Sequence, residues 1–137
     1  MKELTVGAKT ENIECVTDFV NEQLDLYQCP IKAKLQIDIA IDELFGNIAH
    51  YAYVPGEGAA TVRVEVTQKP LSVILTFIDN GMPYNPLAEA DPDVSLPAEK
   101  RKIGGLGIYM VKKSMDELAY EYADGKNILT VKKSLVK

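Results

Sequence analysis

The chain has 137 residues, a formal net charge of −5 and a sequence pI near 4.9. This length supports an apolar core, and we expect a single domain over residues 1–137. The acidic balance opposes binding to nucleic acid or to an anionic membrane surface, so we expect neither as a partner.

The location of the protein is also constrained by the sequence. No apolar run approaches the ~20 residues of a membrane span, and the N-terminal MKELTVGAKTENIE has no apolar stretch behind its lysine, so we expect a cytoplasmic protein. Cys15 and Cys29 lack the CxxC spacing of a metal site. We interpret them as structural thiols in a reducing compartment, with a disulfide as the open alternative.

The first part of the chain predicts one strand followed by two helices. Residues 2–8 form a short strand candidate, and residues 11–27 show helical periodicity with Thr10 as the N-cap. Pro30 opens a second, longer helix over residues 31–53, because proline in a first turn loses no hydrogen bond. The apolar stripe of the first helix comprises Ile13, Val16, Phe19, Val20 and Leu24.

The helix over residues 31–53 is apolar around most of its circumference, which is typical of a helix buried against a sheet. Its apolar positions are Leu35, Ile37, Ile39, Ile41, Leu44, Phe45 and Ile48. Spacings of four and three place Glu43, Asn47 and His50 on one polar stripe. A carboxylate and a carboxamide one turn apart offer a proton acceptor and a neutral oxygen ligand for Mg²⁺ beside a nucleotide. A solvated helix face is the alternative.

His50 is the single histidine of the chain. It lies inside the predicted long helix and not on a separate dimerisation helix, so we interpret it as a structural or site-lining imidazole and not as a phosphoacceptor. Tyr51 and Tyr53 are interpreted as packing residues at the end of the helix.

The second part of the chain predicts two hairpins separated by a long loop and a third helix. The predicted strands are residues 60–67, 71–79, 118–123 and 128–134, with Asp124-Gly125 as the second turn. Residues 82–103 contain four prolines and no sustained periodicity, which is typical of a functional loop.

Glycine-rich sequence opens the helix predicted over residues 106–115. Gly104, Gly105 and Gly107 would let an anion approach the free N–H groups of a helix N-terminus, which favours phosphate. A flexible hinge would use the same residues, and neither GxxxxGK[ST] nor GxGxxG after a strand is present. The order βααββ, loop, αββ predicts an α+β fold, a two-layer α/β sandwich with helices on one face of a mixed, mostly antiparallel sheet.

Three ordered motifs carry a resemblance to a known superfamily. They are IDELFGNIAHYAY (41–53), DNGMPYNP (79–86) and GGLGIYMVKKSMDELAYEY (104–122). The chain resembles the ATPase superfamily of gyrase, heat-shock chaperones, histidine kinases and mismatch-repair proteins, where these motifs are the N box and two glycine boxes. Within it, the chain is most similar to the anti-sigma factor serine/threonine kinases. The resemblance implies a Bergerat-type fold that binds ATP and Mg²⁺.

The resemblance also implies roles for individual residues. Asn47 matches the Mg²⁺ ligand, and Glu43 matches the acidic residue proposed as general base. Asp79 matches the carboxylate that accepts a hydrogen bond from the adenine amino group, with Gly81 close to the base; a strand-end turn former is the alternative for Asp79. The phosphates would meet Gly104, Gly105, Leu106 and Gly107, beneath an ATP lid over about residues 82–103.

The chain departs from the superfamily pattern at three places. Pro83 stands where the first glycine box often has a second glycine. The lid cation is not fixed by position, and among residues 100–102 we favour Arg101 for its planar fork, with a solvated basic run as the alternative. Gly125-Lys126-Asn127 replaces a frequent Gly-Thr pair, so Thr130 or Asn127 is the candidate for a polar contact beside adenine.

The function implied by the resemblance is that of an ATP-dependent serine/threonine protein kinase and anti-sigma regulator. Glu43 would take the proton from a serine hydroxyl of an anti-anti-sigma protein, and a sigma factor would be the alternate ligand. A homodimer is compatible with this resemblance. The alternatives are a non-catalytic, ATP-gated protein-binding module and a detached ATPase domain of a histidine kinase system.

Overall fold

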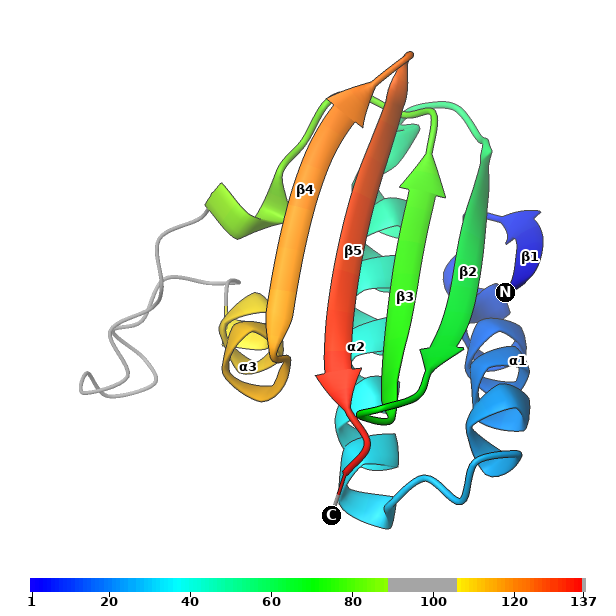
Figure 1. Ribbon diagram of the computed structural model, residues 1–137. Helices are drawn as coiled ribbons and strands as arrows, with labels where there is room; N and C mark the ends of the chain where they lie inside the picture. The colour runs from blue at the N-terminus through cyan, green and yellow to red at the C-terminus, as the bar shows by residue number, and fades with distance from the viewer. Residues whose placement is uncertain (89–105, 137) are drawn as a thin grey trace.

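A computed structural model describes residues 1–88 and 106–136 of the chain (Figure 1). Its elements are β1 Lys2–Gly7, a 3₁₀ turn Thr10–Asn12, α1 Ile13–Asp25, α2 Ile31–Asn47, a π-helical turn Ile48–Ala52, β2 Ala59–Thr67, β3 Ser72–Asp79, a 3₁₀ turn Pro86–Ala88, α3 Leu106–Ser114, β4 Glu117–Ala123 and β5 Lys126–Ser134. The predicted order of strands and helices is confirmed. Most of the predicted lid lies outside the described residues, as do Arg101, Gly104 and Gly105.

The strands form one sheet in the order β1-β2-β3-β5-β4. Every neighbouring pair in it is antiparallel, so among the described residues the sheet expected to be mixed and mostly antiparallel is antiparallel throughout. The reason is the position of β5. The crossover through α3 leaves β3 and β4 parallel to each other, but β5 lies between them and pairs with both (Figure 1).

The helices lie on one face of the sheet, which gives the predicted two-layer α+β arrangement (Figure 1). Alternate strand residues point into this layer and are buried, among them Val62, Val64, Leu75, Phe77, Leu129 and Val131. Each such burial stabilises the fold by about 1.5–3 kcal/mol relative to exposure. The intervening residues Arg63, Thr76 and Thr130 lie in register on the opposite face.

Helix α2 is buried against the sheet as predicted, but on one side only, so part of its apolar circumference is exposed. Ile37, Ile41 and Phe45 are fully buried, but Leu35 and Ile39 are 57% and 47% exposed. The helices form a single layer, and α2 packs between α1 and α3. In the described part of the chain nothing covers its outer side, so apolar residues there remain in contact with solvent.

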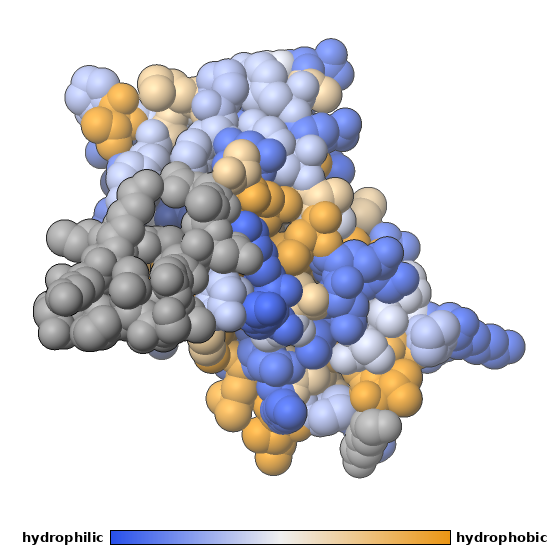
Figure 2. Space-filling model, turned by 90° about the vertical axis from the view of Figure 1, so that its left-hand side faces the viewer, coloured by the Kyte–Doolittle hydropathy of each residue, from blue (hydrophilic) through white to orange (hydrophobic). Residues whose placement is uncertain are grey.

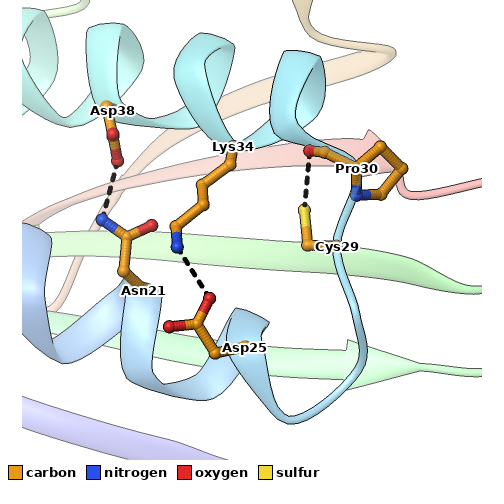
Figure 3. A network of polar contacts seen from close by, with 6 residues as sticks. All are labelled: Asn21, Asp25, Cys29, Pro30, Lys34 and Asp38. Atoms are coloured by element: carbon orange, nitrogen blue, oxygen red, sulfur yellow. Dashed lines mark hydrogen bonds and ion pairs between the residues drawn. The ribbon is translucent and has the colours of Figure 1, made fainter.

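Polar contacts join α1 to the start of α2 (Figure 3). Asn21 donates from Nδ2 to Asp38 Oδ1 at 3.0 Å, and Lys34 Nζ donates to Asp25 Oδ1 at 2.7 Å. The Asp25 hydrogen bond raises the pKa of Lys34. At the other end of α1 the predicted N-cap is wrong, because Thr10 lies in a 3₁₀ turn and makes no side-chain cap.

Both cysteines are free thiols in the structure. Cys15 is exposed, whereas partial burial raises the pKa of the Cys29 thiol. None of the described helices is long and apolar enough to span a membrane.

Candidate functional site

The polar end of the long central helix departs from regular α geometry. The sequence predicts one helix to Tyr53, but α2 ends at Asn47 and a π-helical turn covers Ile48–Ala52. At the end of α2 the N–H of Ile48 is shared between the carbonyls of Leu44 and Phe45. The π turn brings the Ala52 carbonyl to the end of β3, where it accepts a hydrogen bond from Met82 N at 3.0 Å.

The turn after β3 packs directly on this helix end. A Cβ on Gly81 would lie 2.3 Å from the carbonyl oxygen of Ala52, so a side chain does not fit there. Gly81 N donates to Asp79 Oδ1 at 2.8 Å, which folds the turn back on the carboxylate. Glycine at position 81 therefore allows Ala52 of the π turn to pack directly against the turn that contains Asp79.

The hydroxyl of Tyr53 forms hydrogen bonds that fix the same turn. It donates to the Ala59 carbonyl at 2.6 Å and accepts from Asn80 N at 2.8 Å. Burial raises the pKa of Tyr53 above its usual value. The interpretation as a packing residue is correct for Tyr53, whereas Tyr51 is 64% exposed and its ring lies 6.0 Å from that of the exposed His50.

Asn127 is buried beside Asp79, and the two side chains are 6% and 5% exposed. Its Nδ2 donates to Asp79 Oδ1 and to the Met82 carbonyl, both at 2.9 Å. Its Oδ1 accepts from Tyr84 N at 3.1 Å and from the hydroxyl of Tyr120. Of the two alternatives drawn from the sequence, only Asn127 therefore contacts Asp79. Thr130 pairs with Thr76 on the opposite face of the sheet.

The second part of the site is the contact between α2 and α3. A Cβ on Gly107 would lie 2.0 Å from both Cδ and Oε2 of Glu43, so the carboxylate occupies the space left by the missing side chain. Gly107 is in the first turn of α3, where the helix dipole stabilises a negative charge by about 0.3–1 kcal/mol. The contact joins residues from two predicted motifs.

Asn47 lies one helical turn beyond Glu43, about 6 Å along the axis at about 1.5 Å per residue. Both side chains are half-buried, and neither makes a hydrogen bond or ion pair to another described residue. Leu106, which opens α3, is 43% exposed beside them. Glu43, Asn47 and the Asp79–Gly81 turn thus follow one another along the central helix.

The face of the molecule that carries α3 is mixed in character (Figure 2). Hydrophilic residues run through its middle, and hydrophobic residues gather at its lower end.

A groove of about 540 Å³ lies elsewhere, between β1 and α1. Its lining residues are Leu4, Glu11, Glu14, Cys15, Asp18, Phe19 and Glu22. Four carboxylates and no basic side chain line this groove, so its charge opposes a nucleotide phosphate. This groove is therefore not a candidate for the nucleotide site expected from the sequence.

The chain matches the family described as "Histidine kinase-like ATPase domain" over residues 6–133. The chain belongs to this family. The superfamily resemblance drawn from the three motifs is confirmed.

The chain is also similar to individual proteins that are named as protein kinases. The serine/threonine-protein kinase BtrW of Bordetella bronchiseptica is 29% identical over 100 residues, which are 73% of this chain and 70% of the relative. The serine-protein kinase RsbW of Bacillus mycoides is 29% identical over 98 residues, or 69% of this chain. The chain spans only 60% of the length of this RsbW.

Solved structures show the same fold. The RsbU and RsbW domains of a Mycobacterium tuberculosis protein superpose with a TM-score of 0.68 at 16% identity, covering 100% of this chain and 33% of that one. The histidine kinase AdeS of Acinetobacter baumannii superposes with a TM-score of 0.52 at 17% identity, covering 100% of this chain and 70% of that one. These identities support the fold alone.

Proposed function

We propose that this protein is an ATP-dependent serine/threonine protein kinase and anti-sigma regulator. Its substrate would be an anti-anti-sigma protein, and a sigma factor would be its alternate ligand. The observation that carries this assignment is the Glu43 carboxylate seated against Gly107 in the first turn of α3, one helical turn from Asn47. Two relatives named as protein kinases support the same reaction class.

The adenine would bind at the buried end of the site. Asp79 Oδ1 already accepts from Gly81 N and Asn127 Nδ2, whereas Oδ2 has no partner among the described residues. A carboxylate oxygen with a free lone pair accepts a hydrogen bond from an exocyclic amino group. Gly81 would lie close to the base through its backbone, while the space of its missing side chain is taken by Ala52.

The triphosphate would extend along α2 toward the start of α3. The first N–H groups of a helix have no partner within the helix and bind anions. Leu106 and Gly107 stand at this position, and Gly104, Gly105 and Arg101 remain predictions because they lie outside the described residues.

Asn47 is the residue that would hold Mg²⁺. Its amide oxygen is a hard, neutral ligand without a hydrogen bond to another described residue, which fits an ion held largely by phosphates and water. Within the described ranges no group of three His, Cys, Asp or Glu side chains could hold a metal alone. When bound, Mg²⁺ would neutralise charge on the phosphate oxygens.

Glu43 would act as the general base of the transfer. Its carboxylate takes the proton of the serine or threonine hydroxyl as that oxygen forms a bond to the γ-phosphorus and the bond from phosphorus to the β–γ bridging oxygen breaks. ADP leaves with the bridging oxygen. Positioning and charge neutralisation supply most of the rate in such transfers, and α3 offers its positive end to the developing charge.

A second candidate is a non-catalytic module in which ATP orders a protein-binding surface. It is favoured by Asn127, which binds both Asp79 and the segment leading into the predicted lid. Nucleotide would then change the position of that segment without any phosphate transfer.

The test uses the whole chain, Mg²⁺, γ-labelled ATP and a candidate anti-anti-sigma protein. We expect label on a serine or threonine of the partner, loss of transfer in Glu43→Gln with ATP affinity retained, and normal transfer in the control Glu65→Ala, which changes an exposed strand residue. ATP binding without transfer by the unaltered protein would favour the gated module. Absence of ATP binding would refute both.

The same proposal includes a cytoplasmic location and a homodimer. A cytoplasmic anti-sigma regulator should fractionate with soluble proteins, and a homodimer should sediment at twice the mass of the 15.1 kDa chain.

A further inference from the structure

We propose that Asn127 is a positioning residue that sets which oxygen of Asp79 faces the adenine and couples that carboxylate to residues 82–84. This inference rests on the proposed nucleotide site and deepens it. Asn127 enters the site from β5, whereas Asp79 ends β3 and residues 82–84 follow it. The coupling therefore links two strands and the start of the predicted lid.

The first step is the hydrogen-bonding capacity of the amide. A carboxamide has two N–H donors and two acceptor lone pairs. Asn127 uses both donors, on Asp79 Oδ1 and Met82 O, and accepts from Tyr84 N and the Tyr120 hydroxyl. No capacity remains for a ligand, so Asn127 acts through its neighbours and does not contact the base.

The second step concerns Asp79. Gly81 N at 2.8 Å and Asn127 Nδ2 at 2.9 Å both donate to Oδ1, which fixes the plane of the carboxylate. Oδ2 is left as the acceptor that faces the site. Without the Asn127 donor the carboxylate can turn, and the favoured position of Oδ2 is lost.

The third step is the link to the chain after β3. The same amide holds the Met82 carbonyl at 2.9 Å and Tyr84 N at 3.1 Å. Any shift of residues 82–84 moves the amide, and the amide moves Asp79. Binding of adenine to Asp79 should consequently favour one position of residues 82–84, and the reverse holds by linkage.

Asn127→Asp tests this geometry with almost no change of shape. It places a carboxylate oxygen against Asp79 Oδ1, and two carboxylates so close share one proton and titrate as a pair with a raised pKa. Below that pKa the shared proton restores the contact with Asp79, whereas the second lost N–H, to the Met82 carbonyl, is not replaced. Above it, the two charges repel and Asp79 turns away.

The chain offers a matched control in Asn21→Asp. Asn21 Nδ2 also donates to a carboxylate, Asp38 Oδ1 at 3.0 Å, but between α1 and α2 (Figure 3). This variant creates the same acid pair away from the proposed nucleotide site. Its thermal stability should change with pH, while its ATP affinity relative to the unaltered protein should stay constant.

The measurement is titration calorimetry of each whole-chain variant with Mg²⁺-ATP and with Mg²⁺-tripolyphosphate, between pH 5.5 and 8.5. We expect Asn127→Asp to bind ATP about 10-fold or more weakly than Asn21→Asp at pH 8.5 and to recover part of this difference at pH 5.5. Tripolyphosphate affinity should match the control throughout, since the defect concerns the base.

Equal ATP affinities for the two variants at every pH would overturn the role of Asn127, and so would an equal loss of ATP and tripolyphosphate. Failure of the unaltered protein to bind ATP would instead refute the proposed function. If circular dichroism shows Asn127→Asp to be unfolded, Asn127→Thr replaces it. Threonine has a single donor, so we expect a loss of about 3- to 10-fold for ATP and none for tripolyphosphate, and equal losses would again overturn the inference.

Discussion

Gly107→Ala is the sharpest test of the contact between α2 and α3. The new Cβ would lie 2.0 Å from Cδ and Oε2 of Glu43 and 2.3 Å from Oε1, whereas ordinary contact begins at 3.4 Å. The carboxylate must therefore move by about 1.4 Å. Because it is the free end of a flexible side chain, it can move without disturbing the core.

The magnitude follows from two opposing effects. Alanine in place of glycine favours a helix by about 0.5–1 kcal/mol, and loss of the Glu43 interaction with the helix N-terminus costs about 0.3–1 kcal/mol. The free energy of unfolding should thus change by less than about 1 kcal/mol. A displacement of about 1 Å at a catalytic group can cost about 100-fold in rate, so we expect phosphate transfer to fall by about this factor.

The assay compares denaturant unfolding and single-turnover phosphate transfer in Gly107→Ala and in Gly46→Ala. Gly46 lies in α2, and a Cβ there meets no atom within 4 Å, so this control should transfer phosphate normally. Transfer at the unaltered rate in Gly107→Ala would refute the role of Glu43. A loss of stability above about 2 kcal/mol would show that the carboxylate cannot move aside.

Three further predictions concern the adenine end of the site. Gly81→Ala should cost about 1–3 kcal/mol in thermal unfolding, because its Cβ meets the backbone oxygen of Ala52 at 2.3 Å; unchanged stability would contradict the packing. Asp79→Asn should weaken the affinity for ATP at least ~10-fold in calorimetry, since an amide N–H donor takes the place of the acceptor oxygen Oδ2. Retained affinity would count against adenine binding there. Tyr53→Phe should cost about 1–3 kcal/mol through the hydrogen bonds to Ala59 and Asn80. The raised pKa of Tyr53 stabilises the native protein at pH values below the ordinary pKa near 10, and this stabilisation is lost as the pH rises above it. Denaturant unfolding of Tyr53→Phe should therefore show a smaller loss of stability at alkaline pH than the unaltered protein.

The elements that sequence predicts well are those set by local chemistry. The Asp124-Gly125 turn is one example, since both residues have positive φ, 53° and 74°, as a two-residue hairpin turn requires. The exposed side of α2 could not be predicted, because apolar residues around a helix do not tell how many layers cover it. The π turn at Ile48–Ala52 depends on the long-range contact of Ala52 with Met82 and has no local signal.

The candidate site shows the same division. Helical spacing alone puts Glu43 and Asn47 on one stripe, but the contact of Glu43 with Gly107 joins distant parts of the chain and needs the fold. The choice between Asn127 and Thr130 needed the structure, which extends β5 back to Lys126 and so includes Asn127 in the strand. In β5 the buried residues Leu129 and Val131 alternate, so parity places Asn127 on their face and Thr130 on the other.

The exposed outer side of α2 offers a labelling position on the same helix that carries Glu43 and Asn47. Leu35 is 57% exposed and lies about 12 Å along the axis from Glu43, at about 1.5 Å per residue. A fluorophore attached there, in a chain whose exposed Cys15 has been replaced, would lie about two helical turns from Glu43 on the same helix without entering the core. Arrival of nucleotide could then be followed in real time as a change in emission.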